Sequence, residues 1–350
     1  MVKKAENTIV GISVGDLNGI GVEVILKTFE DVRMLEMCTP VLFANVKMIS
    51  FLKKIYKSNL NFNGIDDLSK IIPGKINVFN VWREGATIEL GTEDAKIGEL
   101  AIKSFVSATA ALKEGKIDTL VTAPINKHNI QSDDFKFPGH TDYLNQELDG
   151  DALMLMTHRG LRIGLLTDHV PVSEVSKHIN EALIDKKVTT LLEALKSDFG
   201  ISKPKIALLG LNPHCGDNGV IGKEDDEVII PTIKKLFEKG KMVFGPFSAD
   251  SFFGGKNYEN YDAVLACYHD QGLVPFKTLA FGSGVNYTAG LAQIRTSPDH
   301  GTGFDIAGKD KANEQSFRNA VYMAIDVFKT RKEYEELTEN PLSPKKINKK

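Results

Sequence analysis

Residues 8–32 read TIVGISVGDLNGIGVEVILKTFEDV, and the pattern of side chains changes along this stretch. TIVGISV is a short apolar run rich in β-branched residues, which is typical of a buried strand. A glycine-bearing loop then leads into VEVILKTFEDV, where apolar residues recur at helical spacing. A strand followed by a loop and a helix is the repeating unit of an α/β fold.

The same alternation continues toward the C-terminus. Apolar runs at 39–45, 75–81 and 117–124 are predicted strands, and the segments at 46–57 and 94–116 are predicted helices. This order predicts a largely parallel sheet. Residues 152–169 break the rhythm, because two apolar runs flank a tight His-Arg-Gly turn and predict an antiparallel pair. We therefore expect a mixed sheet and a second subdomain.

Composition excludes several classes of protein. The net charge of −3 argues against a general nucleic-acid surface, and the three cysteines form no CxxC pair for a zinc ribbon. We find no signal-peptide core and no apolar run of about 18 residues. These features predict a soluble cytoplasmic protein with neither a membrane nor a nucleic acid as partner. The basic tail PLSPKKINKK is predicted to be a frayed terminus.

Three histidines follow apolar runs that are predicted strands. His169 follows RIGLLTD, His214 follows IALLGLNP, and His269 follows AVLACY. Ligands of α/β sheets collect beyond the carboxyl ends of strands, so these imidazoles can converge there and bind a divalent metal, with Asp168 and Asp270 orienting two of them. Each histidine taken alone is equally consistent with an ordinary polar loop residue.

A second set of residues suggests an anionic small molecule. His140 and Thr141 follow Pro-Gly and are predicted to open a helix, whose amides favour anions; Thr141 could equally be only the N-cap. Lys277, Asn286 and Arg295 lie after or within strand-like runs, and arginine suits bidentate contact with phosphate or carboxylate.

The usual dinucleotide fingerprint GxGxxG is absent from the sequence. The glycine-rich stretch at 298–317 is instead predicted to be a polar loop beside a cleft, with His300, Thr302 and Asp305.

Motifs along nearly the whole chain resemble one family. VGDLNGIGVEV, VTAPINK, PGHTDYL, LLTDHVPVSEV, LNPHCGDNGVIGKED, GPFSADSFF, YDAVLACYHDQGLVPFK and GVNYTAGLAQIRTSPDHGTGFDIAG are similar to the 4-hydroxythreonine-4-phosphate dehydrogenases of pyridoxine biosynthesis. HGTGFDIAG also resembles the cofactor loop of isocitrate and isopropylmalate dehydrogenases, which lack the usual glycine fingerprint.

The resemblance implies a homodimer of two-domain α/β chains with an isocitrate/isopropylmalate dehydrogenase-like fold. A mixed sheet flanked by helices is expected, with the active site in the interdomain cleft and at the subunit interface. The first domain, on the cofactor side, would span about 1–130 and 296–350. The second, at about 131–295, would carry the metal, substrate and dimer contacts.

The resemblance also implies roles for the residues named above. His169, His214 and His269 would hold one divalent ion (zinc, magnesium or cobalt), with one histidine supplied by the partner subunit. His140, Thr141, Lys277, Asn286 and Arg295 would bind substrate, with Lys277 also catalytic. His300, Thr302 and Asp305 would contact NAD or NADP.

The implied reaction is NAD(P)-dependent oxidation of 4-(phosphooxy)-L-threonine to a β-keto acid that then loses CO2. Two alternatives remain. One is a related dehydrogenase acting on 4-phospho-D-threonate or 4-phospho-D-erythronate, and the other is a non-catalytic metabolite-binding protein on the same scaffold.

The sequence departs from the family pattern at two places. The family's GDPAGIGPE is here GDLNGIGVE, so that Leu17 and Val22 replace prolines and the loop is expected to be less rigid. Cys215 replaces the alanine after His214 and would place a thiol beside the metal.

Overall fold

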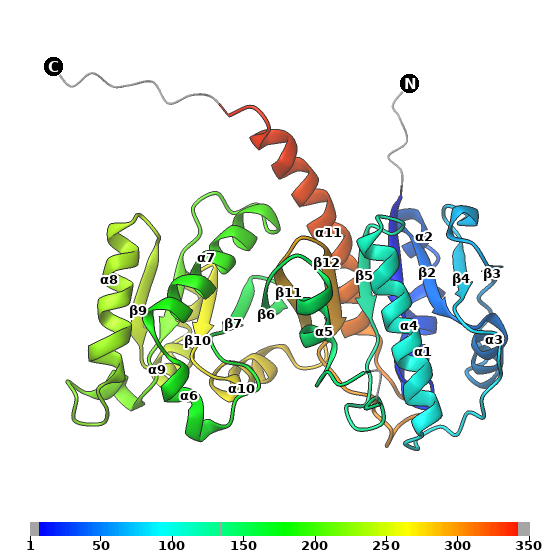
Figure 1. The fold of residues 1–350 in the computed structure, drawn as a ribbon, viewed down its shortest axis with the longest axis horizontal. Coiled ribbons are helices and arrows are strands. Elements are labelled where there is room, and N and C mark those ends of the chain that lie inside the picture. Colours follow the sequence, from blue (N-terminus) through cyan, green and yellow to red (C-terminus); the bar gives the residue numbers. More distant parts are fainter. Residues whose placement is uncertain (1–6, 133–134, 342–350) are drawn as a thin grey trace.

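The computed structural model describes residues 7–132 and 135–341, whose strands form one twelve-stranded sheet (Figure 1). The basic tail at 342–350 lies outside the described residues. The strands are β1 (Thr8–Ser13), β2 (Cys38–Ala44), β3 (Phe62–Ile65), β4 (Ile76–Asn80), β5 (Thr119–Thr122), β6 (Gly150–His158), β7 (Leu161–Leu165), β8 (Ile206–Leu209), β9 (Val243–Phe247), β10 (Ala263–Ala266), β11 (Val285–Leu291) and β12 (Ile294–Pro298).

The sheet is mixed, as predicted. Its strand order is β3-β4-β2-β1-β5-β12-β11-β6-β7-β10-β8-β9. The pairs β12–β11, β11–β6 and β6–β7 at its centre are antiparallel, and the other neighbouring strands are parallel. The predicted hairpin is the pair β6–β7, whose turn contains Arg159 at a φ of 50°. The direction of the chain therefore reverses in the middle of the sheet.

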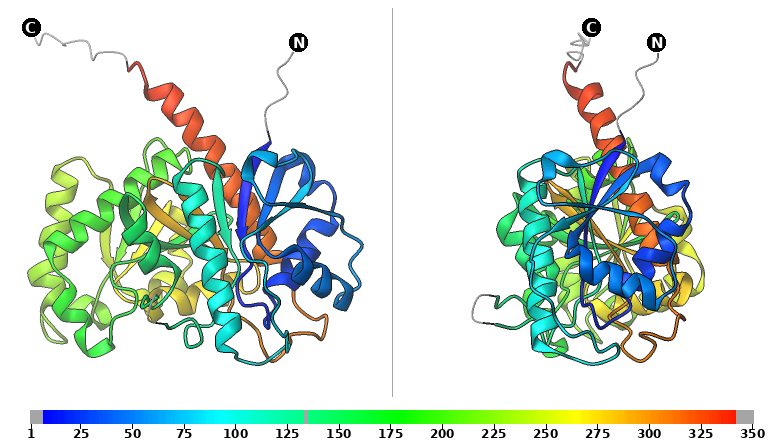
Figure 2. Two further views of the ribbon diagram at one scale, coloured as in Figure 1. Left: turned by 45° about the vertical axis from the view of Figure 1, so that its right-hand side comes forward. Right: turned by 90° about the vertical axis from the view of Figure 1, so that its right-hand side faces the viewer.

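Helices cover both faces of the sheet, and Figure 2 shows α4 and α11 on opposite sides of it. One face packs against α4 (Ala95–Lys113), α5 (His140–Glu147), α9 (Ala249–Gly254) and α10 (His269–Ala280). The other face packs against α1 (Gly21–Glu30), α3 (Val46–Ile55), α6 (Val172–His178), α7 (Glu181–Ser197), α8 (Ile230–Glu238) and α11 (Gln315–Thr338). A single turn, α2 (Met34–Met37), precedes β2.

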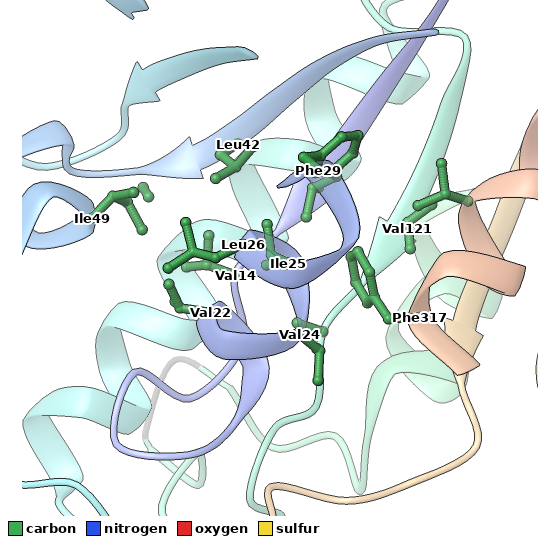
Figure 3. Close-up of a cluster of buried hydrophobic side chains, with 14 of the residues drawn as sticks. Val14, Val22, Val24, Ile25, Leu26, Phe29, Leu42, Ile49, Val121 and Phe317 are labelled. Carbon is green, nitrogen blue, oxygen red and sulfur yellow. The ribbon is translucent and has the colours of Figure 1, made fainter. Parts of the chain in front are cut away.

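The first strand and helix form as the sequence predicts. β1 is almost entirely buried, and α1 buries Val22, Ile25, Leu26 and Phe29 against neighbouring strands and α11 (Figure 3). These four residues follow the i, i+3, i+4, i+7 spacing of one helix face. Burying an aliphatic or aromatic side chain contributes roughly 1.5–3 kcal/mol, so this face anchors α1 on the sheet.

Side chains hold the loop between β1 and α1. The buried Asp16 accepts hydrogen bonds from the backbone N–H of Asn18 and from Nδ2 of Asn129, both at 2.8–2.9 Å. Asn18, which stands where the family pattern has alanine, donates to the carbonyl of Thr92 and accepts from the backbone N–H of Glu89. These bonds restrain a loop that the loss of two prolines was expected to loosen.

The structure corrects the prediction for the residues after β10. Lys277 is predicted to lie after or within a strand-like run, but the run VPFK that ends in it (274–277) lies inside α10. The reason is the spacing of the apolar side chains: Leu273 and Phe276 are buried against the sheet while Val274 is exposed, which is a helical pattern. His269 and Lys277 therefore belong to one helix.

Apolar side chains on the two faces form four clusters, two toward each end of the sheet. The strands nevertheless continue without interruption from β3 to β9. The division into domains at about 1–130 plus 296–350 and 131–295 stays a prediction. Within the described residues, every helix is too short or too polar to cross a bilayer.

Candidate functional site

A cavity of about 260 Å³ lies over the central strands, on the sheet face that carries α5 and α10. Strands β5, β6, β11 and β12 form its floor, and the two helices contribute to its walls. The floor residues are Thr122, Met154, Met156, Asn286, Arg295 and Ser297, and the helices add His140, Thr141, Asp142, His269, Leu273 and Lys277.

The reversal of the chain explains this position. β5 and β12 run in one direction, while β7 and β10 run in the other, with the antiparallel β11 and β6 between them. α10 begins after β10 and packs back over β6 and β7. The candidate site thus lies on a face of the sheet, between two sets of carboxyl ends.

Arg295 is the most unusual residue of the floor. Its side chain is only 2% exposed, yet its guanidinium contacts only hydroxyl groups, at Thr122 (2.7 and 3.1 Å) and Thr288 (3.2 Å). None of its contacts among the described residues is a carboxylate. Burial lowers the pKa of Arg295 to about 9. A buried cation without a counterion is unfavourable, so this position favours an anionic ligand.

Three further polar atoms at the cavity lack partners. Nε2 of His140, Oδ1 of Asn286 and Nε2 of His300 are buried and form no hydrogen bond among the described residues. Burial, together with the charges of Arg295 and Lys127, lowers the pKa of His140 well below its usual value. Its imidazole is therefore neutral and can donate or accept one hydrogen bond at Nε2, depending on the tautomer.

His140 and Thr141 open α5, as predicted. The N-cap position is Gly139, which has no side chain to cap the helix, so the alternative in which Thr141 is the N-cap is wrong. The ring of Phe105 packs edge-on against the His140 ring, with centroids 4.6 Å apart. This contact fixes the imidazole beside the free amides of the first turn, which favour negative charge.

His169 and His269 lie together at the cavity. Their ring centroids are 5.9 Å apart, and Oδ1 of Asp270 lies 2.7 Å from Nδ1 of His269. This contact leaves Nε2 of His269 available to a metal, the arrangement that a carboxylate usually gives a histidine ligand. Burial, with the charge of Lys127, lowers the pKa of His169, which favours the neutral form that binds metals. Asp168 instead accepts from the backbone N–H of His169.

His214 does not join this pair. It lies in the 3₁₀ turn Pro213–Gly216, where it is exposed, and it does not line the cavity. Within residues 7–132 and 135–341 of one chain, no three His, Cys, Asp or Glu side chains come close enough to hold one ion. The three-histidine set stays a prediction, with a partner subunit as the expected source of one ligand. Burial raises the pKa of the Cys215 thiol.

Of the remaining predicted residues, some line the cavity and others lie outside it. Nζ of Lys277 donates to the carbonyl of Asp299 at 3.1 Å, and both residues line the cavity. His300 also lines it, whereas Thr302 and Asp305 do not. The carbonyl of Thr302 accepts from the backbone N–H of Ile20, so the glycine-rich loop packs against the loop after β1. The cofactor role of these loop residues stays a prediction.

Sequence reasoning missed three charged residues of the cavity. They are Lys127, Asp142 and Asp299. All three lie in motifs of the family, VTAPINK, PGHTDYL and GVNYTAGLAQIRTSPDHGTGFDIAG, so the motifs carried a signal for them. Asp299 is held by Ser316, and its burial raises the pKa of its carboxyl. With Arg295 and Lys277, Lys127 gives the cavity three cationic side chains.

Comparison with known proteins identifies one matching family. Residues 36–324 match the family model described as pyridoxal phosphate biosynthetic protein PdxA. The chain belongs to the PdxA family. This assignment confirms the resemblance seen in the motifs, and it makes the chain a member of a dehydrogenase family of pyridoxal phosphate biosynthesis.

Relatives in the PdxA family carry two kinds of name. A 4-hydroxythreonine-4-phosphate dehydrogenase of Bacteroides thetaiotaomicron is 46% identical over 340 residues, covering 96% of this chain and 93% of its own. A D-threonate 4-phosphate dehydrogenase of Cupriavidus necator is 34% identical over 324 residues, covering 91% and 97%. The crystal structure of a 4-hydroxythreonine-4-phosphate dehydrogenase from Klebsiella pneumoniae has a TM-score of 0.79 at 30% identity and covers 93% of this chain and 98% of its own.

Proposed function

We propose that this PdxA-family chain oxidises 4-(phosphooxy)-L-threonine with NAD or NADP. The product, 2-amino-3-oxo-4-(phosphooxy)butanoate, would then lose CO2 to give 3-amino-2-oxopropyl phosphate. The observation that carries the proposal is Arg295, a buried guanidinium without a carboxylate partner among the described residues, in the same cavity as the His169–His269 pair. The name of the Bacteroides relative supports the choice of substrate.

The substrate's anionic groups would be bound by the cationic and hydrogen-bond-donating groups of the cavity. The Arg295 guanidinium would donate charge-assisted hydrogen bonds to a phosphate or carboxylate. His140, whose Nε2 is buried and unpartnered, and the amides of the first turn of α5 would contribute further donors. Because these groups are fixed by the sheet and by Phe105, they would orient the substrate before any chemistry occurs.

The residues present fit a divalent metal. The imidazole rings of His169 and His269 have centroids 5.9 Å apart, so both could supply a nitrogen to one ion. The resident ion would be zinc, magnesium or cobalt, and it would supply Lewis acidity, which lowers the pKa of an alcohol. His214 is exposed and outside the cavity of its own chain, so we assign it to the site of the partner subunit in a homodimer.

Lys277 is the proposed residue for proton movement. It faces the cavity from the same helix as His269, two turns further on, and the carbonyl of Asp299 holds its Nζ. We assign to it the transfer of the proton at the substrate hydroxyl, while NAD or NADP supplies a hydride acceptor. Loss of CO2 from a β-keto acid then leaves electrons on the ketone oxygen, where neighbouring cations stabilise the charge.

Steady-state assays and metal analysis test this proposal together. The wild-type protein should form NADH or NADPH with 4-(phosphooxy)-L-threonine. His169→Ala should lose both bound zinc and turnover, whereas His128→Ala, which changes an exposed histidine outside the cavity, should keep both. Full turnover and metal content in His169→Ala would refute the metal role, and no nucleotide reduction by the metal-loaded wild type would refute the reaction.

A second candidate substrate is 4-phospho-D-threonate. It is favoured by the name of the Cupriavidus relative, and the same unpaired Arg295 would bind its phosphate. The two substrates differ at C2, where one has an amine and the other a hydroxyl. A ratio of kcat/KM values for the two compounds, measured with each nucleotide, assigns the substrate; a higher value for the threonate would replace the first proposal.

A further inference from the structure

The loop that carries His214 is built in an unusual backbone conformation. Six consecutive residues, 214–219, have positive φ angles of 53°, 54°, 81°, 44°, 54° and 82°. Only two of the six are glycines. A left-handed conformation costs a residue with a Cβ roughly 1–2 kcal/mol, so four such residues in one turn must be held by contacts around them.

Asp225, at the start of the next helix, holds the residues that lead into this turn. Its side chain is completely buried, and its carboxylate accepts from the backbone N–H groups of Leu211 and Asn212 at 2.8 and 3.0 Å. It also accepts from Nδ2 of Asn212 at 3.0 Å. Three hydrogen bonds to one buried carboxylate fix the two residues that lead into the left-handed turn.

Asn212 connects Asp225 to the turn through hydrogen bonds. Its Nδ2 also donates to Oε2 of Glu224 at 2.9 Å, and its carbonyl accepts from the backbone N–H of Cys215 at 3.0 Å. A Cβ on Gly222 would lie 2.6 Å from that same Nδ2, so the chain closes tightly around the Asn212 side chain. Hydrogen bonds with Asp225 and Asn212 thus hold the start of the turn, while the His214 side chain itself is exposed.

We propose that Asp225 is a positioning residue for His214, and that it presents this imidazole to the metal of the partner subunit. The inference rests on the proposed function, in which His214 completes the histidine set. The buried carboxylate does not touch the ion; it fixes the backbone from which the ligand projects. Residues that orient metal ligands typically change metal affinity 10–100-fold when they are altered.

Asp225→Asn is the principal test, in the full-length protein stripped of metal. The amide keeps the shape of the carboxylate but cannot accept from all three donors, so the turn loses at least one hydrogen bond. We expect the Kd for Zn²⁺, measured by titration calorimetry, to rise 10–100-fold. The Kd for inorganic phosphate, which reports the Arg295 cavity, should change less than twofold. The matched control is Asp226→Asn, an exposed neighbour, which should bind zinc as the wild type does.

Two further variants keep the test decisive. If Asp225→Asn fails to fold, Asn212→Ala removes the side-chain link while leaving the backbone N–H, and it should weaken zinc binding in the same direction. Unchanged zinc affinity in a folded Asp225→Asn protein, with binding lost in His214→Ala, would overturn the positioning role alone. Unchanged affinity in His214→Ala would overturn the proposed ligand set and this inference with it.

Discussion

Two arginines on opposite faces of the central strands, one buried and one partly buried, have opposite surroundings. Arg331 of α11 is 15% exposed and donates to the carboxylate of Asp198, the hydroxyl of Tyr287 and the carbonyl of Ala292. Arg295 of β12 is more deeply buried, and within the part of the chain that the structure describes its guanidinium donates only to hydroxyls. Contacts with Tyr287 and Asp198 raise the pKa of Arg331, whereas burial lowers that of Arg295.

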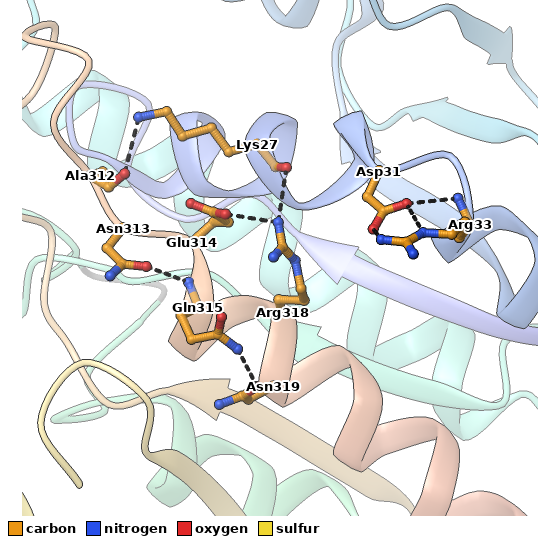
Figure 4. Close-up of polar contacts among 9 residues, drawn as sticks. All are labelled: Lys27, Asp31, Arg33, Ala312, Asn313, Glu314, Gln315, Arg318 and Asn319. Atoms are coloured by element: carbon orange, nitrogen blue, oxygen red, sulfur yellow. Dashed lines mark hydrogen bonds and ion pairs between the residues drawn. The ribbon is translucent and has the colours of Figure 1, made fainter.

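This difference indicates that the charge of Arg331 stabilises the fold, whereas the charge of Arg295 is available to bind a ligand. Arg331 joins α11 to the end of α7 and to β11, because Asp198 follows α7 and Tyr287 lies in β11. Two hydrogen bonds likewise join α1 to α11 and to the chain before it (Figure 4). Lys27 donates to the carbonyl of Ala312, and Arg318, which is paired with Glu314, donates to the carbonyl of Lys27. Arg295 has no such anionic partner among the described residues, so its charge is available to a ligand.

The largest expected effect is on substrate binding by Arg295→Met. This change removes two charge-assisted hydrogen bonds, each contributing about 1.5–3 kcal/mol, so kcat/KM for the phosphorylated substrate should fall roughly 10²- to 10⁴-fold. The melting temperature should not fall, because the change removes an unpaired buried charge. A loss of stability with unchanged kcat/KM would show that Arg295, like Arg331, has a structural role and does not bind the substrate.

The converse change, Arg331→Met, should act on stability. It leaves the buried Asp198 carboxylate without its cation, which costs about 3–5 kcal/mol of unfolding free energy. Urea denaturation monitored by circular dichroism measures this loss. Below the melting transition, the KM for substrate should stay near the wild-type value. A wild-type unfolding free energy in this variant would remove the structural role assigned to the pair.

Inorganic phosphate should stabilise the wild-type protein through Arg295. Ligand at 100 times its Kd adds about 2.7 kcal/mol to the unfolding free energy when it binds only the folded state. A thermal-shift titration checks this, with sulfate as a second tetrahedral anion. The shift should vanish in Arg295→Met and persist in Arg331→Met; equal shifts in both variants would place the anion elsewhere.

The smallest effect is expected for Tyr287→Phe. The hydroxyl donates to Asp198 and accepts from Arg331, and its loss should lower the unfolding free energy by about 1 kcal/mol. Tyr287 and the cavity residue Asn286 are neighbours in β11 and point to opposite faces of the sheet. The kcat and KM of the variant should therefore stay within about twofold of the wild-type values. A larger change would mean that the two faces of the sheet are energetically coupled.

Much of the fold follows from local pattern in the sequence. The strand–helix alternation and the hairpin at β6–β7 were predicted because apolar spacing reports burial directly. The placement of VPFK in a strand-like run failed, since a four-residue apolar run has no clear period. The position of the cavity could not be predicted either, because it depends on β11 lying between β12 and β6, a pairing between distant segments.

The candidate site was predictable to the extent that its residues lie in motifs. His140, Thr141, His169, His269, Lys277, Asn286, Arg295 and His300 all line the cavity, although they are scattered over the chain. The sequence could not show that Arg295 has no carboxylate hydrogen-bond partner among residues 7–132 and 135–341, since this depends on which side chains surround β12. The burial of the Asp225 side chain could not be predicted either, because acidic residues at the start of a helix are usually exposed.

The cavity has a strand floor and helical walls, and this division affects how substrate preference can change. Residues of the floor belong to a sheet that runs through the whole protein, so replacing one disturbs the packing of its neighbours. The first turn of α5 and the side of α10 that lines the cavity lie outside the sheet, so changes there disturb fewer strand contacts. Selectivity for one phosphorylated acid over another can therefore diverge through these two helices, while recognition of the shared phosphate stays constant.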